Sequence, residues 1–230
     1  MAKLERLGTK YGGWVLPKEM DLDENSIIYS VGVGEDISFD MLLSDKYKCN
    51  IVLVDPTKRA KIHYDEVVHF YEKIKWKMSG DIQEDYYGIM YPLKPDIKKI
   101  EFIEKGLWIE KKENVKFYKQ DNEQYVSQSL KEGVFGEKYN EVSTNTLKNI
   151  KDERDHFDID VLKLNTSGVE VKVLSDMLNE NIFPRYICVQ FSVKNQSDQD
   201  EVVAILTRLQ HVRYQIIMNE GRKFTLKLVK

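Results

Sequence analysis

Two glycines and two carboxylates end an apolar run near the start of the chain, and their types and spacing could serve ligand binding. Residues 27–36 read Ile-Ile-Tyr-Ser-Val-Gly-Val-Gly-Glu-Asp, and a helix is predicted directly after them, over 37–43. Gly32 and Gly34 let the backbone turn sharply and approach a ligand without a Cβ in the way. The order strand, glycine turn, helix predicts a cradle for a nucleotide-like ligand. Close packing of a strand and a helix also explains such a turn, so the glycines alone leave both interpretations open.

A further carboxylate lies at the spacing that such a cradle requires. Asp55 ends the apolar run Asn50–Val54 and follows Gly34 by 21 positions. In a strand–helix–strand unit this spacing places Asp55 beside the glycine turn, where its carboxylate can accept hydrogen bonds from both ribose hydroxyls. The turn and the acid together therefore predict a nucleotide-type ligand.

The rest of the chain alternates between apolar strands and amphipathic helices, which would position these groups. Apolar residues at spacings of three and four predict a helix over 60–78. Further strands are expected over 100–103, 115–118, 159–164 and 185–193, further helices over 169–178 and from a Ser197 cap to about 210, and a hairpin over 214–229. This order predicts one doubly wound, three-layer α/β domain, mostly parallel with an antiparallel C-terminal hairpin. Its ligand would lie at the strand ends marked by Gly34, Asp55, Gln120-Asp121, Asn165 and Ser192.

Composition and charge narrow the class of protein. The 230 residues are long enough for one sizeable core, and a net charge of −3 argues against a general nucleic-acid binder. No run approaches the ~18 apolar residues of a membrane span, and residues 1–6 lack the apolar core of a signal peptide. Cys49 and Cys188 show no metal spacing and fit buried thiols of a reducing compartment. We expect a cytoplasmic protein that binds neither nucleic acid nor membrane, and we leave a homodimer open.

The motifs, taken in order, resemble the FkbM-type family of S-adenosylmethionine-dependent methyltransferases. The segments that carry the resemblance are Tyr11–Trp14, Ser30–Asp40, Val54–Thr57, Gly106–Trp108, Val126–Ser129 and Asp160–Glu170. They follow the family order and extend over most of the chain. Members of this family are mostly O-methyltransferases acting on sugars or other small hydroxylated metabolites. The resemblance implies a Rossmann-like methyltransferase sheet within one domain of residues 1–230. Residues 1–25 are expected to be a lead-in, whose apolar part either plugs the edge of the core or lines the mouth of the site, and 60–110 an acceptor-side insertion.

The resemblance also implies a role for each residue of the cofactor site. Gly32 and Gly34 would flank the methionine part of S-adenosylmethionine, Glu35 or Asp36 would hold its ammonium, Asp55 would take the ribose hydroxyls, and Asp121 and Asn122 would contact the adenine. Charge agrees with this cofactor, because its sulfonium and ammonium favour nearby carboxylates. The pyrophosphate of NAD would be repelled by acids in the same turn.

The chain departs from the family pattern where the acceptor should be deprotonated. Neutral side chains replace the usual acids at Asn165 and Ser167, the usual histidine at Gln128 and the usual glutamate at Gln190. Each exchange keeps a similar shape and removes an ionisable or metal-binding group, so no metal site is expected.

Two functions remain open at this point. The first is an O-methyltransferase acting on a hydroxyl of a sugar, glycan or other small metabolite, in which Asn165 holds the acid's usual place and Lys163 or His156 is the base. The second is a catalytically impaired S-adenosylmethionine-binding subunit or scaffold.

Overall fold

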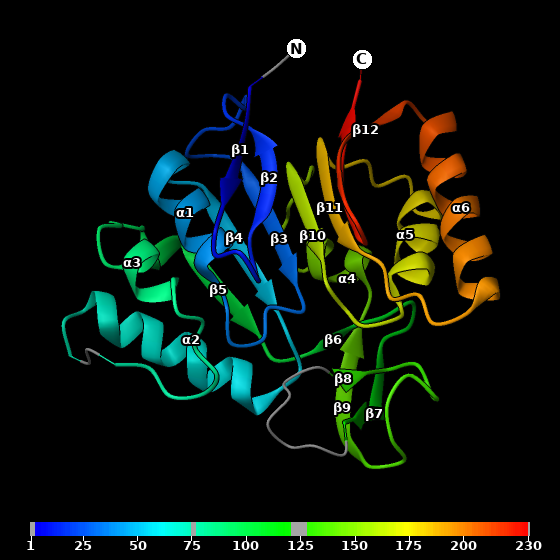
Figure 1. Cartoon of the computed structure of the whole chain (residues 1–230), viewed down its shortest axis with the longest axis horizontal. Helices are drawn as coiled ribbons and strands as arrows, with labels where there is room; N and C mark the ends of the chain where they lie inside the picture. Colours follow the sequence, from blue (N-terminus) through cyan, green and yellow to red (C-terminus); the bar gives the residue numbers. More distant parts are fainter. Residues whose placement is uncertain (1–2, 75–76, 121–127, 230) are drawn as a thin grey trace.

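The computed structural model describes residues 3–74, 77–120 and 128–229. Figure 1 shows a central sheet with helices on both of its faces. The elements are β1 (Leu4–Leu7), β2 (Trp14–Pro17), β3 (Ile27–Val31), α1 (Ser38–Tyr47), β4 (Asn50–Val54), α2 (Lys58–Tyr71), α3 (Tyr86–Met90), a short 3-10 turn (Ile97–Lys99), β5 (Ile100–Ile103), β6 (Gly106–Leu107), β7 (Lys112–Lys119), β8 (Gln128–Ser129), β9 (Tyr139–Asn145), α4 (Leu147–Asp152), β10 (Val161–Leu164), α5 (Glu170–Asn179), β11 (Tyr186–Gln190), α6 (Gln196–His211), β12 (Tyr214–Glu220) and β13 (Lys223–Leu228).

The central sheet has seven strands in the order β12-β13-β11-β10-β3-β4-β5. Neighbours from β11 to β5 pair in parallel, whereas β13 is antiparallel to both β11 and β12. The chain thus has a Rossmann-like, mostly parallel sheet with antiparallel C-terminal strands, and the predicted α/β fold class is confirmed. The predicted C-terminal hairpin is also present, but its second strand lies between β11 and β12 rather than at the edge of the sheet.

Two apolar cores, one on each face of the sheet, hold the three layers together. Because strand side chains alternate, Val31 and Leu162 face α4, α5 and α6, while Ile28 and Val161 face α1, α2 and α3. Figure 1 shows these two groups of helices on opposite sides of the sheet. Strand β4 is buried on both faces, which explains its continuous apolar run.

Several helix boundaries differ from the sequence prediction, and the end of α2 and the start of α6 show local reasons for this. The second helix ends at Tyr71 rather than Met78, and Lys73 just beyond it adopts a left-handed conformation with φ +63°. Asn195, not Ser197, caps α6, because its extended backbone lets its side chain accept from the Asp198 N–H at 2.9 Å. The prediction placed that cap two residues too late.

Strands β6, β7, β8 and β9 form a small sheet of order β6-β9-β7-β8 that the sequence did not predict as a unit. Figure 1 shows it beyond the arrowheads of β3, β4 and β5. The range 60–110, expected to be an acceptor-side insertion, includes most of α2 and the whole of β5, which belong to the central fold. Where an acceptor binds stays a prediction.

Candidate functional site

A cavity of about 400 Å³ lies where the parallel strands end, covered by the small sheet. The central sheet contributes residues 31–35, 54–57, 165–167, Gln190 and Ser192, and the small sheet contributes Gly106, Leu107, Phe117 and Gln128. Lys10 and Tyr11 of the lead-in also line it. Strand ends that were predicted to gather at one edge, among them Asp55, Asn165 and Ser192, therefore do meet in one cavity.

The two glycines of the turn act in different ways. Gly32 has φ +71°, and a Cβ on it would lie 2.0 Å from the Asn165 carbonyl oxygen. Gly34 has φ +56°, and its N–H donates to Asp55 Oδ2 at 3.0 Å. The first glycine lets the end of β3 approach the end of β10, and the second ties the turn to the end of β4.

Asp55 is buried beside this turn, and its carboxylate accepts three hydrogen bonds from neighbouring residues of the chain. Its Oδ1 accepts from the Thr57 N–H at 2.9 Å and from the Thr57 hydroxyl at 2.7 Å. Burial raises the pKa of this carboxyl, while the bonds from Thr57 and Gly34 act in the opposite direction. Among the residues that the structure describes, Gly34 is the one donor to Oδ2. Each carboxylate oxygen can accept two hydrogen bonds, so Oδ2 can accept one more donor from the cavity.

Glu35 lines the cavity, but its carboxylate is already paired. Arg59 donates to it through Nε at 3.0 Å and Nη2 at 2.7 Å, and the Asp81 N–H donates at 3.1 Å. A bidentate guanidinium pair neutralises the acid. Glu35 is thus at the predicted place without presenting an unpaired charge there.

Asp36 is buried outside the set of cavity-lining residues. It accepts from the Ser38 N–H at 3.0 Å and the Ser38 hydroxyl at 2.6 Å, and also from the Thr9 hydroxyl. These bonds hold the lead-in against the start of α1. Its hydrogen bonds give it a structural role, and the ammonium-binding role that the resemblance implies stays a prediction.

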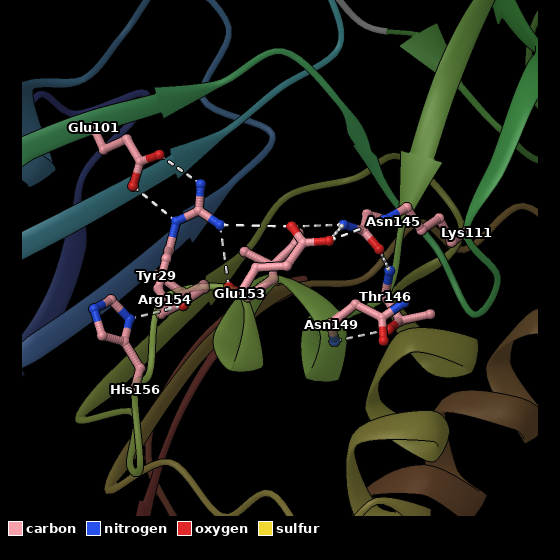
Figure 2. A network of polar contacts seen from close by, with 10 residues as sticks. Tyr29, Glu101, Lys111, Asn145, Thr146, Asn149, Glu153, Arg154 and His156 are labelled. Atoms are coloured by element: carbon pink, nitrogen blue, oxygen red, sulfur yellow. Dashed lines mark hydrogen bonds and ion pairs between the residues drawn. The ribbon is translucent and has the colours of Figure 1, made fainter.

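The two candidate bases, Lys163 and His156, lie outside the cavity. Lys163 points to the α1 side of β10, in register with Ser30 and Cys188, near the fully buried Asp40. His156 lies in a polar network on the α4 side, where its Nδ1 and the Tyr29 hydroxyl are 2.9 Å apart (Figure 2). Neither side chain lines the cavity.

Asn165 does line the cavity, but an amide has no basic proton acceptor. The predicted adenine contacts, Asp121 and Asn122, lie outside the described residues.

The four neutral exchanges noted in the sequence gather at this one cavity: Gln128, Asn165, Ser167 and Gln190 all line it. Within the described part of the chain, the buried Oε1 atom of Gln128 has no hydrogen-bond partner. A buried carbonyl oxygen without a donor costs about 1–3 kcal/mol. The cavity therefore holds an acceptor that a ligand donor would satisfy.

Lys223 also lines the cavity, and sequence reasoning missed it. It is the first residue of β13, whose antiparallel direction brings its start to the carboxyl ends of the other strands, opposite Gln190. Its Nζ donates to the carbonyl oxygens of Tyr11 and of Gly13, the latter at 3.1 Å, and lies 5.1 Å from the centre of the Trp14 ring. The sequence predicted the terminal hairpin that contains Lys223. It did not predict that the second strand of this hairpin pairs with β11, which is what brings Lys223 to the cavity.

Two searches over the described residues gave negative findings. Residues 3–74, 77–120 and 128–229 contain no group of three or more His, Cys, Asp or Glu side chains that could hold a metal ion. Within the same ranges, no helix is long and apolar enough to cross a membrane.

Comparison with known proteins gives a distant structural likeness to a solved structure. No family model matches the chain, and no curated protein matches it. The solved structure of M. capricolum TrmK in complex with S-adenosyl-homocysteine aligns at a TM-score of 0.38 with 12% sequence identity. The alignment covers 90% of this chain and 62% of that one, so the chain spans less than two thirds of TrmK's length. The FkbM-type family is therefore not confirmed, and the fold rests on the strand order described above.

Proposed function

We propose that this chain is an S-adenosylmethionine-dependent O-methyltransferase acting on a hydroxyl of a sugar, glycan or other small metabolite. One observation carries the proposal: the glycine turn, Asp55 and the polar ends of β10 and β11 line a single cavity at the carboxyl edge of a Rossmann-like methyltransferase sheet. Ligands of such sheets bind at that edge. The cavity volume of about 400 Å³ falls in the usual range of small-molecule sites.

The residues of the cavity fit this cofactor. Gly32 keeps the end of β3 free of a Cβ, and the remaining lone pair of Asp55 Oδ2 would accept one ribose hydroxyl. The unpartnered Oε1 of Gln128 would accept a second donor, for which the adenine amino group is suited. When bound, S-adenosylmethionine supplies an activated methyl group on a sulfonium.

The neutral polar groups at the ends of β10 and β11 support a hydroxylated acceptor. Asn165, Ser167, Gln190 and Ser192 offer both donors and acceptors without formal charge. Such a surface matches sugar hydroxyls, which donate and accept equally well. Methyl transfer can depend largely on holding the acceptor oxygen in line with the methyl group.

A second function, an S-adenosylmethionine-binding subunit without catalysis, is favoured by the same neutral groups. At the positions where the family pattern has acids and a histidine, the cavity carries only amides and a hydroxyl. On this alternative, the cofactor side of the site binds while no acceptor is methylated.

Binding and turnover measured together test both functions. Titration calorimetry and thermal unfolding should show that S-adenosylmethionine and S-adenosylhomocysteine bind and stabilise the protein and that NAD does not. Formation of S-adenosylhomocysteine over a panel of methyl glycosides and small polyols should then identify an acceptor. Binding without turnover across the panel would favour the subunit, and stabilisation by NAD alone would overturn both.

A further inference from the structure

Lys223 lines the side of the cavity on which the neutral polar groups of β10 and β11 gather. It pairs with Gln190 across β13 and β11, and it lines the cavity together with Gln190, Ser192 and Asn165. The neutral exchanges remove the usual acids and histidine from that side. An amine on the neighbouring antiparallel strand is therefore placed where the sequence pattern lacks a base.

We propose that Lys223 is the general base of the methyl transfer, accepting the acceptor's hydroxyl proton on Nζ; this rests on the proposed function. The geometry suits a neutral amine, which has two N–H groups and one lone pair. The two N–H groups are taken by the carbonyl oxygens of Tyr11 and Gly13. The lone pair is then left for the proton of the acceptor.

The groups around Lys223 bring its ionisation near neutral pH. Burial is the main cause that lowers its pKa, Lys163 of β10 and Arg6 of β1 act in the same direction, and Glu220 of β12 and Asp36 oppose them, so that the pKa lies at about 8. The Trp14 ring stabilises the ammonium form as well. A base whose pKa lies near the working pH is effective, because a useful fraction is neutral and its conjugate acid holds the proton.

Other cavity-lining groups are less suited to this step. The Tyr11 hydroxyl has a raised pKa because of burial and the nearby Asp36. Asp55 is committed to Thr57 and Gly34 at the cofactor side. Lys10 lies in the lead-in at the mouth of the cavity.

The step balances without any further reactant. The acceptor oxygen attacks the methyl carbon, so an O–C bond forms while the C–S bond breaks and its electron pair returns to sulfur as a neutral thioether. The hydroxyl proton passes to Nζ of Lys223, which becomes an ammonium. Release of that proton to water restores the neutral amine.

The Lys223→Arg variant separates a base from a structural clamp. Arginine can still donate to the Tyr11 and Gly13 carbonyls but cannot accept a proton at ordinary pH. We expect kcat on an active methyl glycoside to fall at least about 100-fold, while the Kd of S-adenosylhomocysteine changes less than threefold. Lys227→Arg is the matched control, since Lys227 belongs to the same strand but lies over the Tyr186 ring, and it should retain wild-type kcat.

The pH profile provides the second readout. Wild-type kcat should fall tenfold per unit as pH drops below about 8, because the base is then protonated, and Lys223→Arg should lack this limb. Wild-type activity in Lys223→Arg, or a profile flat from pH 6 to 9 in the wild type, would overturn the assignment while leaving the proposed function intact. Loss of S-adenosylhomocysteine binding in the variant would make Lys223 structural and overturn it too. A wild type inactive on the whole panel would reject the proposed function and the base with it.

Discussion

Two regions of this protein are rich in polar side chains, the network of Figure 2 and the cavity, and they differ in how many of their hydrogen-bonding atoms lack a partner. The network in Figure 2, on the α4 side of the sheet, joins Arg154 to Glu101, Lys111 to Glu153 at 3.0 Å, and His156 to Tyr29 at 2.9 Å. Every one of these groups has a partner within the chain. The cavity is different, because Gln128 Oε1 has no partner among the described residues and Asp55 Oδ2 has only one.

The difference teaches that residue type alone does not mark a functional site. His156 is the kind of residue that could act as a base, yet it lies before the start of β10 and away from the cavity. Burial and the nearby Arg154 also lower its pKa. Unused hydrogen-bonding capacity, directed into a cavity, is the feature that separates the two regions.

Gly32→Ala is expected to have the largest effect, because it disturbs the backbone on which the cavity is built. The new Cβ would meet the Asn165 carbonyl oxygen at 2.0 Å, and alanine is strained at φ +71°. We expect a loss of about 3 kcal/mol in the free energy of unfolding, at the upper end for a strained backbone position. Urea denaturation measures it.

A second glycine, Gly133, serves as a control that separates the cost of a positive φ from the cost of a steric clash. Gly133 has a similar φ of +76°, but a Cβ there would meet nothing within 4 Å. Gly133→Ala should cost about 1 kcal/mol, the penalty of the left-handed conformation alone. Equal losses in the two variants would show that the approach of β3 to β10 is not what Gly32 protects.

Asp55→Ala should come next, and it acts on cofactor affinity. We expect weaker S-adenosylmethionine binding by ~1–3 kcal/mol, the scale of a lost charged hydrogen bond. Calorimetry on the folded variant measures the change, and unchanged affinity would show that the ribose is held elsewhere.

Asp36→Ala is the control for Asp55, since Asp36 is also a buried acid with hydroxyl and backbone partners but does not line the cavity. It should lower stability and leave the Kd of S-adenosylmethionine within twofold. A loss of affinity equal to that of Asp55→Ala would instead restore Asp36 as an ammonium ligand.

The parts of the fold that depend on local pattern were predictable. The spacing from Gly34 to Asp55 led correctly to two neighbours joined by a hydrogen bond of 3.0 Å. The apolar runs led to the strands of the central sheet, since strands buried on both faces carry few polar residues. Asn165 and Gln128 were identified as departures, and both line the cavity.

The parts that depend on long-range partners were not predictable. The small sheet contains two strands of only two residues, β6 and β8, and a β7 whose first three residues are all exposed, so no periodic pattern marks the sheet as a unit. The pairing of Glu35 with Arg59 and the insertion of β13 beside β11 are decided by tertiary packing. That insertion is what carries Lys223 to the cavity.

Tyr29→Phe should have the smallest effect, and it tests whether the two polar regions are independent. The change removes one hydroxyl and its 2.9 Å contact with His156, whose ring is only half-buried and can turn to water instead. We expect a loss of about 1 kcal/mol in the free energy of unfolding, typical of a single hydrogen bond. The Kd of S-adenosylmethionine should stay within twofold, because no residue of the network lines the cavity. If this variant weakened cofactor binding as much as Asp55→Ala, the network would be part of the site. The presence of a hydrogen-bond partner for each of its groups would then no longer distinguish the network from the cavity.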